Sequence, residues 1–224
     1  MWRDALVVAG KDLRIERRSW VGLNQVLPYA LTVLLLFGFA FDQDRSLLAQ
    51  AAPGLYWLAV VFAGLPAVQR SFAVEAADGA ADGLRMSGLE PAGIFLGKAA
   101  AVALQLLVAQ AVLAGGVAVL FHSRLAGPGL LVASALVSTA GVAGAGVAYG
   151  ALLVGLRARE TLLPLLLAPV LAPVVLAATQ AWRSALGLSA GPGGGWRWFG
   201  LLACFTVVYL AGGVLSFGAL MEET

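Results

Sequence analysis

The chain has 224 residues, of which 61% are hydrophobic and only 12% are charged, with a formal net charge of +2. A soluble globular protein carries about twice that share of charged residues, so this composition excludes an ordinary soluble domain or a nucleic-acid-binding protein. It indicates an all-α, polytopic helical membrane protein. A disulfide within the chain and a Cys-rich metal site are both excluded, because Cys204 is the one cysteine.

The first segment, residues 1–20, predicts an amphipathic helix that lies in the membrane interface. Its apolar residues recur at helical spacing and its charged residues fill the other faces, with basic side chains directed toward anionic lipid headgroups. The apolar positions are Trp2, Ala5, Leu6, Ala9 and Leu13, and the charged ones are Arg3, Lys11, Asp12, Arg14, Glu16 and Arg18.

Six stretches further along are long and apolar enough to span a bilayer, which takes about twenty residues. They cover residues 21–41, 51–68, 98–121, 129–155, 161–181 and 199–220. The fourth span carries Gly146 and Gly150, a spacing of small residues that lets helices approach closely in lipid. The fifth contains Pro164, Pro169 and Pro173, so we expect it to be kinked or broken.

The distribution of Lys and Arg sets the expected topology. Ten lie in the N-terminal segment and the loops after spans two and four, against four in the loops on the other side. The positive-inside rule therefore predicts that both termini and the insert of residues 69–97 face the cytoplasm.

The insert at residues 69–97 is longer than a turn between two spans requires, which indicates a docking element for a partner. Its plainer interpretation is a solvated interfacial turn. It gathers charged residues and helix-breaking residues within about thirty positions. These are Arg70, Glu75, Asp78, Gly79, Asp82, Gly83, Arg85, Gly88, Glu90 and Pro91, with Lys98 at its end.

Other candidate sites have plainer interpretations. The stretch from Gly93 to Lys98 resembles a phosphate-binding loop but has three residues between its glycines where four are needed, so we expect Lys98 to snorkel at the entrance to span three. His122 at the end of that span is a possible haem ligand, although an interfacial polar residue is the simpler interpretation. Cys204 is interpreted as an apolar filler of span six.

Three more polar features complete this survey. The residues 191–198, GPGGGWRW, predict an external loop whose tryptophans belong to the aromatic belt, with stacking on a flat ligand as the alternative. Gln105, Gln110 and the pair Asn24–Gln25 predict hydrogen bonds between helices or subunits. No acidic or basic residue is expected deep in a span, so the sequence predicts neither a proton pathway nor an acid–base pair for catalysis.

Several motifs together resemble the CcmB family, the permease subunit of the cytochrome c maturation ABC transporter. The motifs are Lys11-Asp12-Leu13-Arg14, Arg17-Arg18-Ser19, Arg70-Ser71-Phe72 with Glu75 and Asp78-Gly79, then Leu84, Ser87, Pro91, Gly97-Lys98, and Arg159-Glu160-Thr161-Leu162-Leu163-Pro164. The likeness covers nearly the whole chain. One departure is Gly88-Leu89-Glu90 before Pro91, where the family more often has apolar residues around a Ser-Pro pair.

This resemblance implies a homodimeric ABC-2 exporter-like permease in the bacterial inner membrane. The implied partners are a CcmA-like ATPase that binds ATP, CcmC-like and CcmD-like membrane subunits, and a CcmE-like periplasmic haem chaperone. It implies no cofactor on this chain, with haem as a substrate of the complex. The residues implied to contact the ATPase are Arg70, Glu75, Asp78, Gly79, Leu84, Arg85, Ser87 and Pro91. The alternatives are an ABC-2 permease for another lipid or drug-like substrate and a membrane scaffold without a transport role.

Overall fold

The computed structural model describes residues 1–19, 28, 31–33, 35–36, 39–40, 45–77, 88–121, 127–154, 156, 159–188 and 194–222. In this part of the chain the regular secondary structure is entirely helical. The helices are α1 (Trp2–Ser19), α3 (Arg45–Ala77), α5 (Pro91–Phe121), α6 (Pro128–Leu152), α7 (Arg159–Ala185) and α8 (Gly194–Glu222). The predicted all-α class is therefore confirmed.

Five of these helices contain stretches long and apolar enough to cross a membrane, namely Ser46–Ala73, Pro91–Val117, Pro128–Leu152, Glu160–Ala185 and Gly194–Ala219. They correspond to the second through sixth predicted spans. The first predicted span, residues 21–41, lies largely outside the described residues. The helices extend beyond the predicted bounds, most clearly α3, because a charged residue at the membrane surface ends the apolar stretch without ending the helix.

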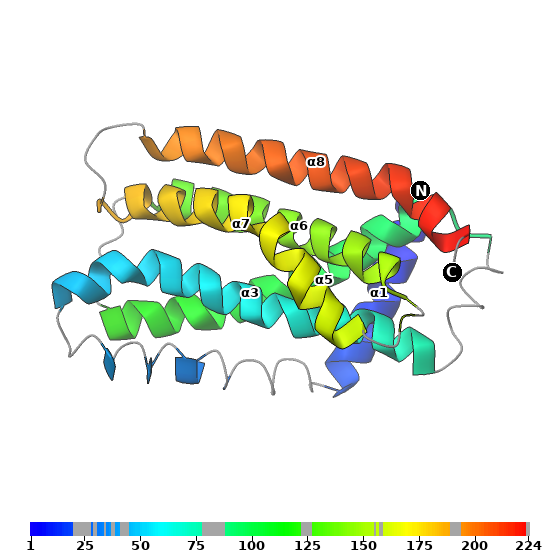
Figure 1. Ribbon diagram of the computed structural model, residues 1–224, viewed down its shortest axis with the longest axis horizontal. Helices are drawn as coiled ribbons and strands as arrows, with labels where there is room; N and C mark the ends of the chain where they lie inside the picture. Colours follow the sequence, from blue (N-terminus) through cyan, green and yellow to red (C-terminus); the bar gives the residue numbers. More distant parts are fainter. Residues whose placement is uncertain are drawn as a thin grey trace.

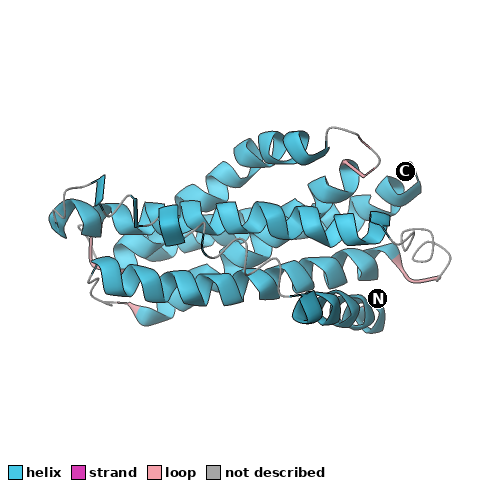
Figure 2. Ribbon diagram, turned by 90° about the horizontal axis from the view of Figure 1, so that it is seen from below, coloured by secondary structure: helices cyan, strands magenta, loops and turns pink. Residues whose placement is uncertain are grey.

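The five long helices run alongside one another as a bundle, and α1 runs across one end of it (Figure 1). The start of α1 and the end of α8 lie at this same end, as the view turned by 90° also shows (Figure 2). Helix α7 contains the three predicted prolines and changes direction along its length (Figure 1). The predicted kink is present, and the helix is not broken.

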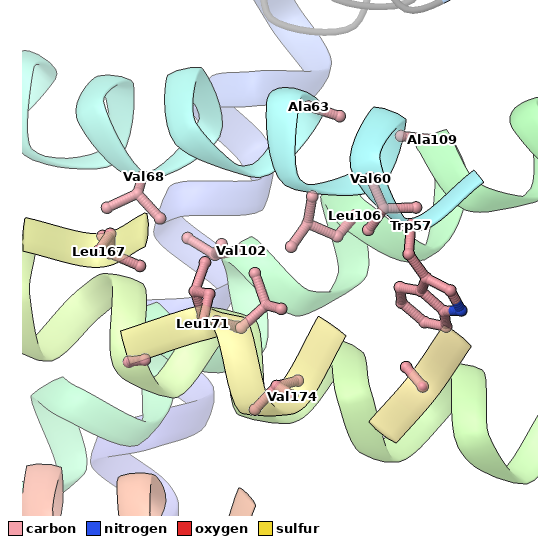
Figure 3. Packing of buried hydrophobic residues seen from close by; sticks show 14 of the residues in the cluster. Trp57, Val60, Ala63, Val68, Val102, Leu106, Ala109, Leu167, Leu171 and Val174 are labelled. Atoms are coloured by element: carbon pink, nitrogen blue, oxygen red, sulfur yellow. The ribbon is translucent and has the colours of Figure 1, made fainter. Parts of the chain in front are cut away.

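Part of the core lies where α3, α5 and α7 meet (Figure 3), and the same cluster of buried residues continues into α6 and α8. Val60 on α3 lies next to Leu106 on α5, and Leu171 and Val174 on α7 close the cluster from the other side. The ring of Trp57 packs edge-on against Trp182 of α7. These residues recur at intervals of three or four along their helices, so each helix presents a continuous apolar stripe to its neighbours.

Glycines set how closely the helices approach. A Cβ atom at Gly146 or Gly150 of α6 would collide with Val68 and Phe72 of α3, so the predicted close approach at these two positions is confirmed. On another face of α6, a Cβ at Gly141 would lie 2.7 Å from the hydroxyl of Thr206 on α8. That hydroxyl donates a hydrogen bond of 3.1 Å to the carbonyl of Val137.

Two adjacent glycines of α8 provide a matched test of this packing. A Cβ at Gly213 would collide with the ring of the fully buried Phe95 of α5, whereas a Cβ at Gly212 would meet nothing within 4 Å. We expect Gly213→Ala to lower the free energy of unfolding by about 1–3 kcal/mol through overpacking. Gly212→Ala should leave it unchanged or raise it, because alanine favours helix. Thermal unfolding of both variants in detergent checks this, and equal effects would contradict the tight α5–α8 contact.

Candidate functional site

The end of the bundle crossed by α1 is where polar side chains from distant parts of the sequence come together. Helix α1 packs along the first turns of α5, next to the last turns of α3. Both α3 and α5 lead from this end into residues 78–90, here termed the connecting segment. The connecting segment therefore joins α3 to α5 at the end of the bundle where α1 lies.

Two glycines allow α1 to lie directly on α5. A Cβ at Gly93 would be 2.8 Å from the Cβ of Asp4, and a Cβ at Gly97 would be 2.6 Å from the carbonyl oxygen of Ala5. Any side chain at either position would push α1 away. The stretch from Gly93 to Lys98 resembles a phosphate-binding loop in sequence. Its two glycines, however, are the positions where α1 contacts α5.

Helix α1 packs on α5 through only part of its apolar surface. Ala5, Val8 and Glu16 are buried, whereas Trp2 is 75% exposed and Leu6 74% exposed. The spacing of three to four residues from Ala5 through Val8 to Asp12 and Glu16 defines the buried stripe. Two carboxylates therefore lie on the face that packs against the bundle, and the bulky apolar pair Trp2 and Leu6 points away from it.

Lys98 receives one of these carboxylates. Its side chain is only 1% exposed, and its Nζ lies 3.5 Å from Oδ2 of Asp12 on α1. The ammonium also donates a hydrogen bond of 3.3 Å to the carbonyl oxygen of Ser71 on α3 and lies 4.9 Å from the centre of the Phe72 ring. The prediction that Lys98 snorkels to the surface was wrong, because a carboxylate, a carbonyl and an aromatic face from two other helices surround its charge.

A second ion pair lies beside the first. Nε of Arg70 on α3 is 3.2 Å from Oε2 of Glu16, one helical turn beyond Asp12 on α1. We call Asp12, Glu16, Arg70, Ser71 and Lys98 the charged junction. It connects α1, α3 and α5. Each basic side chain lies next to an acidic one, so each buried charge has a partner of opposite sign.

Two further contacts extend this arrangement. The amide of Gln69 on α3 donates a hydrogen bond of 3.1 Å to the carbonyl oxygen of Glu160, which joins α3 to the start of α7. At the other end of α1, the amino group of Met1 lies 2.8 Å from Oε2 of Glu90 and 3.1 Å from Oδ2 of Asp4. Helix α1 therefore contacts the chain on both sides of the connecting segment.

The ionic contacts of Met1 shift two pKa values in opposite directions. Hydrogen bonding to Glu90, and then to Asp4, raises the pKa of the Met1 amino group above its usual 8.0. The amino group in turn lowers the pKa of Asp4 below 3.8. The amino group contributes fully to the stability of the folded state below pH 8, and this contribution is lost as the pH rises through its raised pKa. The contribution of Asp4 to stability is lost as the pH falls through its lowered pKa. Both groups are exposed, so water screens the interaction.

The structure places some of the predicted ATPase-contact residues and leaves others outside the described part. Arg70 belongs to the charged junction, Glu75 lies in the last turn of α3, and Pro91 begins α5. Asp78, Gly79, Leu84, Arg85 and Ser87 lie outside the described residues. The predicted insert of residues 69–97 is shorter than expected, because residues 69–77 continue α3 and residues 91–97 already belong to α5.

The remaining predicted polar features have mixed outcomes. Gln110 on α5 donates a hydrogen bond of 2.6 Å to Thr139 on α6, which confirms the predicted contact between helices. Trp196 and Trp198 lie in the first turns of α8 instead of in a loop, and Trp196 packs edge-on against Phe199. Cys204 lies within the span of α8, as expected, and its side chain is exposed on the outside of the bundle. His122 and the pair at residues 24–25 lie outside the described residues.

The acidic residues of α1 were the part of the site that sequence reasoning missed. Asp12 and Glu16 are four residues apart and continue the spacing of Ala5 and Val8, a pattern that places two carboxylates on a buried stripe. Such a stripe predicts basic partners on whichever helix α1 packs against. It does not identify those partners, because Arg70 and Lys98 are far away in the sequence.

Comparison with known proteins gives consistent matches along the chain. The family model described as "CcmB protein" matches residues 3–222. A protein named "Heme exporter protein B" from Paracoccus denitrificans is 32% identical over 175 residues, which cover 77% of this chain and 79% of that protein. The protein of the same name from Bradyrhizobium diazoefficiens is 28% identical over 217 residues, 95% of each chain. That from Rhodobacter capsulatus is 31% identical over 180 residues, 80% of this chain and 83% of that protein.

Two lysines that share one carboxylate test the charged junction. Lys98 and Lys11 both lie near Asp12, but Lys98 is buried whereas the Lys11 side chain is 35% exposed. We expect Lys98→Met to lower the free energy of unfolding by about 3 kcal/mol or more, because it leaves Asp12 without its buried partner. Lys11→Met should change it by less than about 1 kcal/mol. Thermal unfolding in detergent measures both, and equal losses would show that the buried pair does not hold α1 in place.

Proposed function

Because the chain belongs to the CcmB family, we propose that it is the membrane permease subunit of an ABC transporter complex that acts in haem delivery or export for c-type cytochrome maturation. It is a multi-pass membrane protein and a transporter component. The single observation that carries this proposal is the family match over residues 3–222, which includes every predicted ATPase-contact residue.

The coupling of this permease to ATP hydrolysis runs through the connecting segment. A separate CcmA-like ATPase docks there and supplies the free energy. The supporting observation is that α1 pairs with Arg70 before the segment and with Lys98 after it, and that Met1 contacts Glu90, the last residue of the segment. A force on the segment then reaches α3 and α5 as one unit instead of bending one helix. The family resemblance supports CcmC-like, CcmD-like and CcmE-like components as the other partners, and a homodimer of this chain.

Haem is the substrate of the complex in this proposal, and this chain does not ligate its iron. Its part is to convert nucleotide-driven motion into transfer of haem or release of the haem-loaded chaperone. His122 and Cys204 are the one histidine and the one cysteine of the sequence, and they lie about eighty residues apart in it. A pair of axial haem ligands made of one histidine and one cysteine from a single copy of the chain could therefore only be His122 with Cys204.

The proposed location is the bacterial inner membrane, with both termini and the connecting segment in the cytoplasm. We expect single cysteines introduced at Ala80 and Glu222, in a Cys204→Ala background, to react with an impermeant maleimide only from the cytoplasmic side. A cysteine at Gly194 should react only from the periplasmic side. The prediction follows from the ten-to-four distribution of basic residues. Labelling of position 80 in intact cells would place the connecting segment on the wrong side for an ATPase.

A charge reversal tests the docking of the ATPase. Glu75 and Asp78 are three residues apart and both acidic, and hydrogen bonds to charged groups contribute about 1.5–3 kcal/mol each. We expect Glu75→Lys with Asp78→Lys to weaken ATPase binding by two or more orders of magnitude and to stop cytochrome c maturation. The measurements are co-purification of the ATPase and haem staining of c-type cytochromes.

The matched control reverses Glu222 and Glu223, two acidic residues on the same predicted side of the membrane. It changes the net charge equally and should leave both measurements at the level of the unmodified chain. Normal insertion of the Glu75 and Asp78 variant, shown by its solubility in mild detergent, separates loss of docking from misfolding. An intact complex with normal cytochrome output from that variant would remove the connecting segment from the mechanism.

A further inference from the structure

An apolar groove lies between α5 and α6, at the end of the bundle away from α1. Its volume is about 360 Å³, which is within the range of sites that hold small organic ligands. The described residues that line it come from α3, α5, α6 and α7 and from the turn that follows α7. They are Tyr56, Leu107, Gln110, Ala111, Ala114, Val117, Leu131, Val132, Ala135, Leu136, Trp182 and Leu186.

The groove opens sideways between two membrane-spanning helices. Ala111 on α5 and Val132 and Leu136 on α6 are exposed at its edges, and all three lie within the candidate spans. The opening therefore lies at the depth of the membrane-spanning segments. Leu31, a described residue of the first predicted span, packs near Gly116 on a different face of α5 and does not occupy the groove.

The inner wall of the groove carries hydrogen-bond donors that the protein satisfies poorly. The ring of Tyr56 stacks on that of Trp182 with 4.0 Å between centroids. Trp182 is only 7% exposed, and its indole nitrogen has no hydrogen-bond partner among the described residues. The hydroxyl of Tyr56 lies 3.4 Å from both oxygens of Gln110, a long separation for such a bond. Buried donors of this kind are unusual and call for an acceptor.

We propose that this groove binds one acyl chain of an ester-linked membrane phospholipid, with the ester carbonyl close to the indole of Trp182. The alanines and leucines along α5 and α6 accommodate the hydrocarbon chain. The carbonyl oxygen supplies the acceptor that the wall lacks. Trp182 lies in the last turn of α7 and Leu186 directly follows that helix. Both are therefore close to the membrane boundary, where tryptophan is common and the polar ends of lipids lie. The proposal is independent of the proposed function.

Photolabelling tests whether a lipid chain enters the groove. The full-length protein is placed in nanodiscs that contain a phosphatidylethanolamine with a diazirine on one acyl chain, irradiated, digested and mapped by mass spectrometry. We expect labelling of the α5 and α6 groove peptides to exceed that of the exposed α8 face by about tenfold. Ala111→Phe with Ala135→Phe, which fills the groove, should remove that excess.

The matched control places phenylalanine at Ala211, which is exposed on α8 away from the groove, and it should leave the labelling of the groove unchanged. Uniform labelling of all lipid-facing helices would overturn the proposal. So would unchanged labelling in the groove-filling variant, or a change of oligomeric state in that variant, which would assign the groove to a second copy of the chain. If haem co-purifies with the unmodified chain and with the control variant but not with the groove-filling variant, the groove is a haem site and the proposal is overturned.

Replacement of Trp182 tests the role of the carbonyl without filling the groove. We expect the unmodified chain to retain an ester-linked phosphatidylethanolamine about two- to tenfold better than its ether-linked analogue, measured by native mass spectrometry with equal amounts of both lipids. Trp182→Phe keeps the stack on Tyr56 but removes the indole N–H, so the preference should disappear. Equal retention of the two lipids by the unmodified chain, or an undiminished preference in the variant, would overturn the assignment of the carbonyl to Trp182.

Discussion

The buried ammonium of Lys98 is the constraint on which the end of the bundle depends. A charge that is 1% exposed is costly unless opposite charge and hydrogen-bond acceptors replace the lost water. Asp12 from α1 and the backbone of Ser71 from α3 supply these groups. Without α1, the ammonium of Lys98 would be either exposed to solvent or buried without an acidic partner. Helix α1 is therefore an integral part of the fold. This electrostatic requirement explains why a surface helix is joined so firmly to two membrane spans.

Close contact between backbones makes this arrangement possible. Gly93 and Gly97 let α1 lie on α5, and Gly146 and Gly150 let α6 lie on α3. In a bilayer the hydrophobic effect gives little reason for one helix to pack on another, so van der Waals contact and hydrogen bonds between helices decide the packing. A small residue at such a contact has greater structural importance than its size suggests.

The two ends of the bundle differ in chemistry in a way that fits two different tasks. The end that carries α1 is charged and holds the connecting segment between α3 and α5 through contacts on both sides. The opposite end contains an apolar groove with aromatic residues and Gln110 on its inner wall. Helices α3 and α5 contribute to both regions. A displacement of these helices at one end would therefore change the shape of the groove at the other.

Composition and local spacing determined the class of this protein, its five described spans and one of the close contacts between helices. These features depend on residues near one another in the chain, namely long apolar stretches and pairs of small residues such as Gly146 and Gly150. The same reasoning located Arg70, Glu75 and Pro91 around the segment that joins α3 to α5. It placed the ends of that segment wrongly, because helices continue past the membrane surface.

The tertiary structure alone decided which residues of distant segments meet. The sequence placed Lys98 at a membrane surface, and only the packing of α1 across α5 brought Asp12 to it. The spacing within α1 did not specify which side of the helix packs on α5, and the structure leaves Trp2 and Leu6 exposed. Contacts between helices depend on their relative rotation and crossing, which periodicity within one helix does not specify.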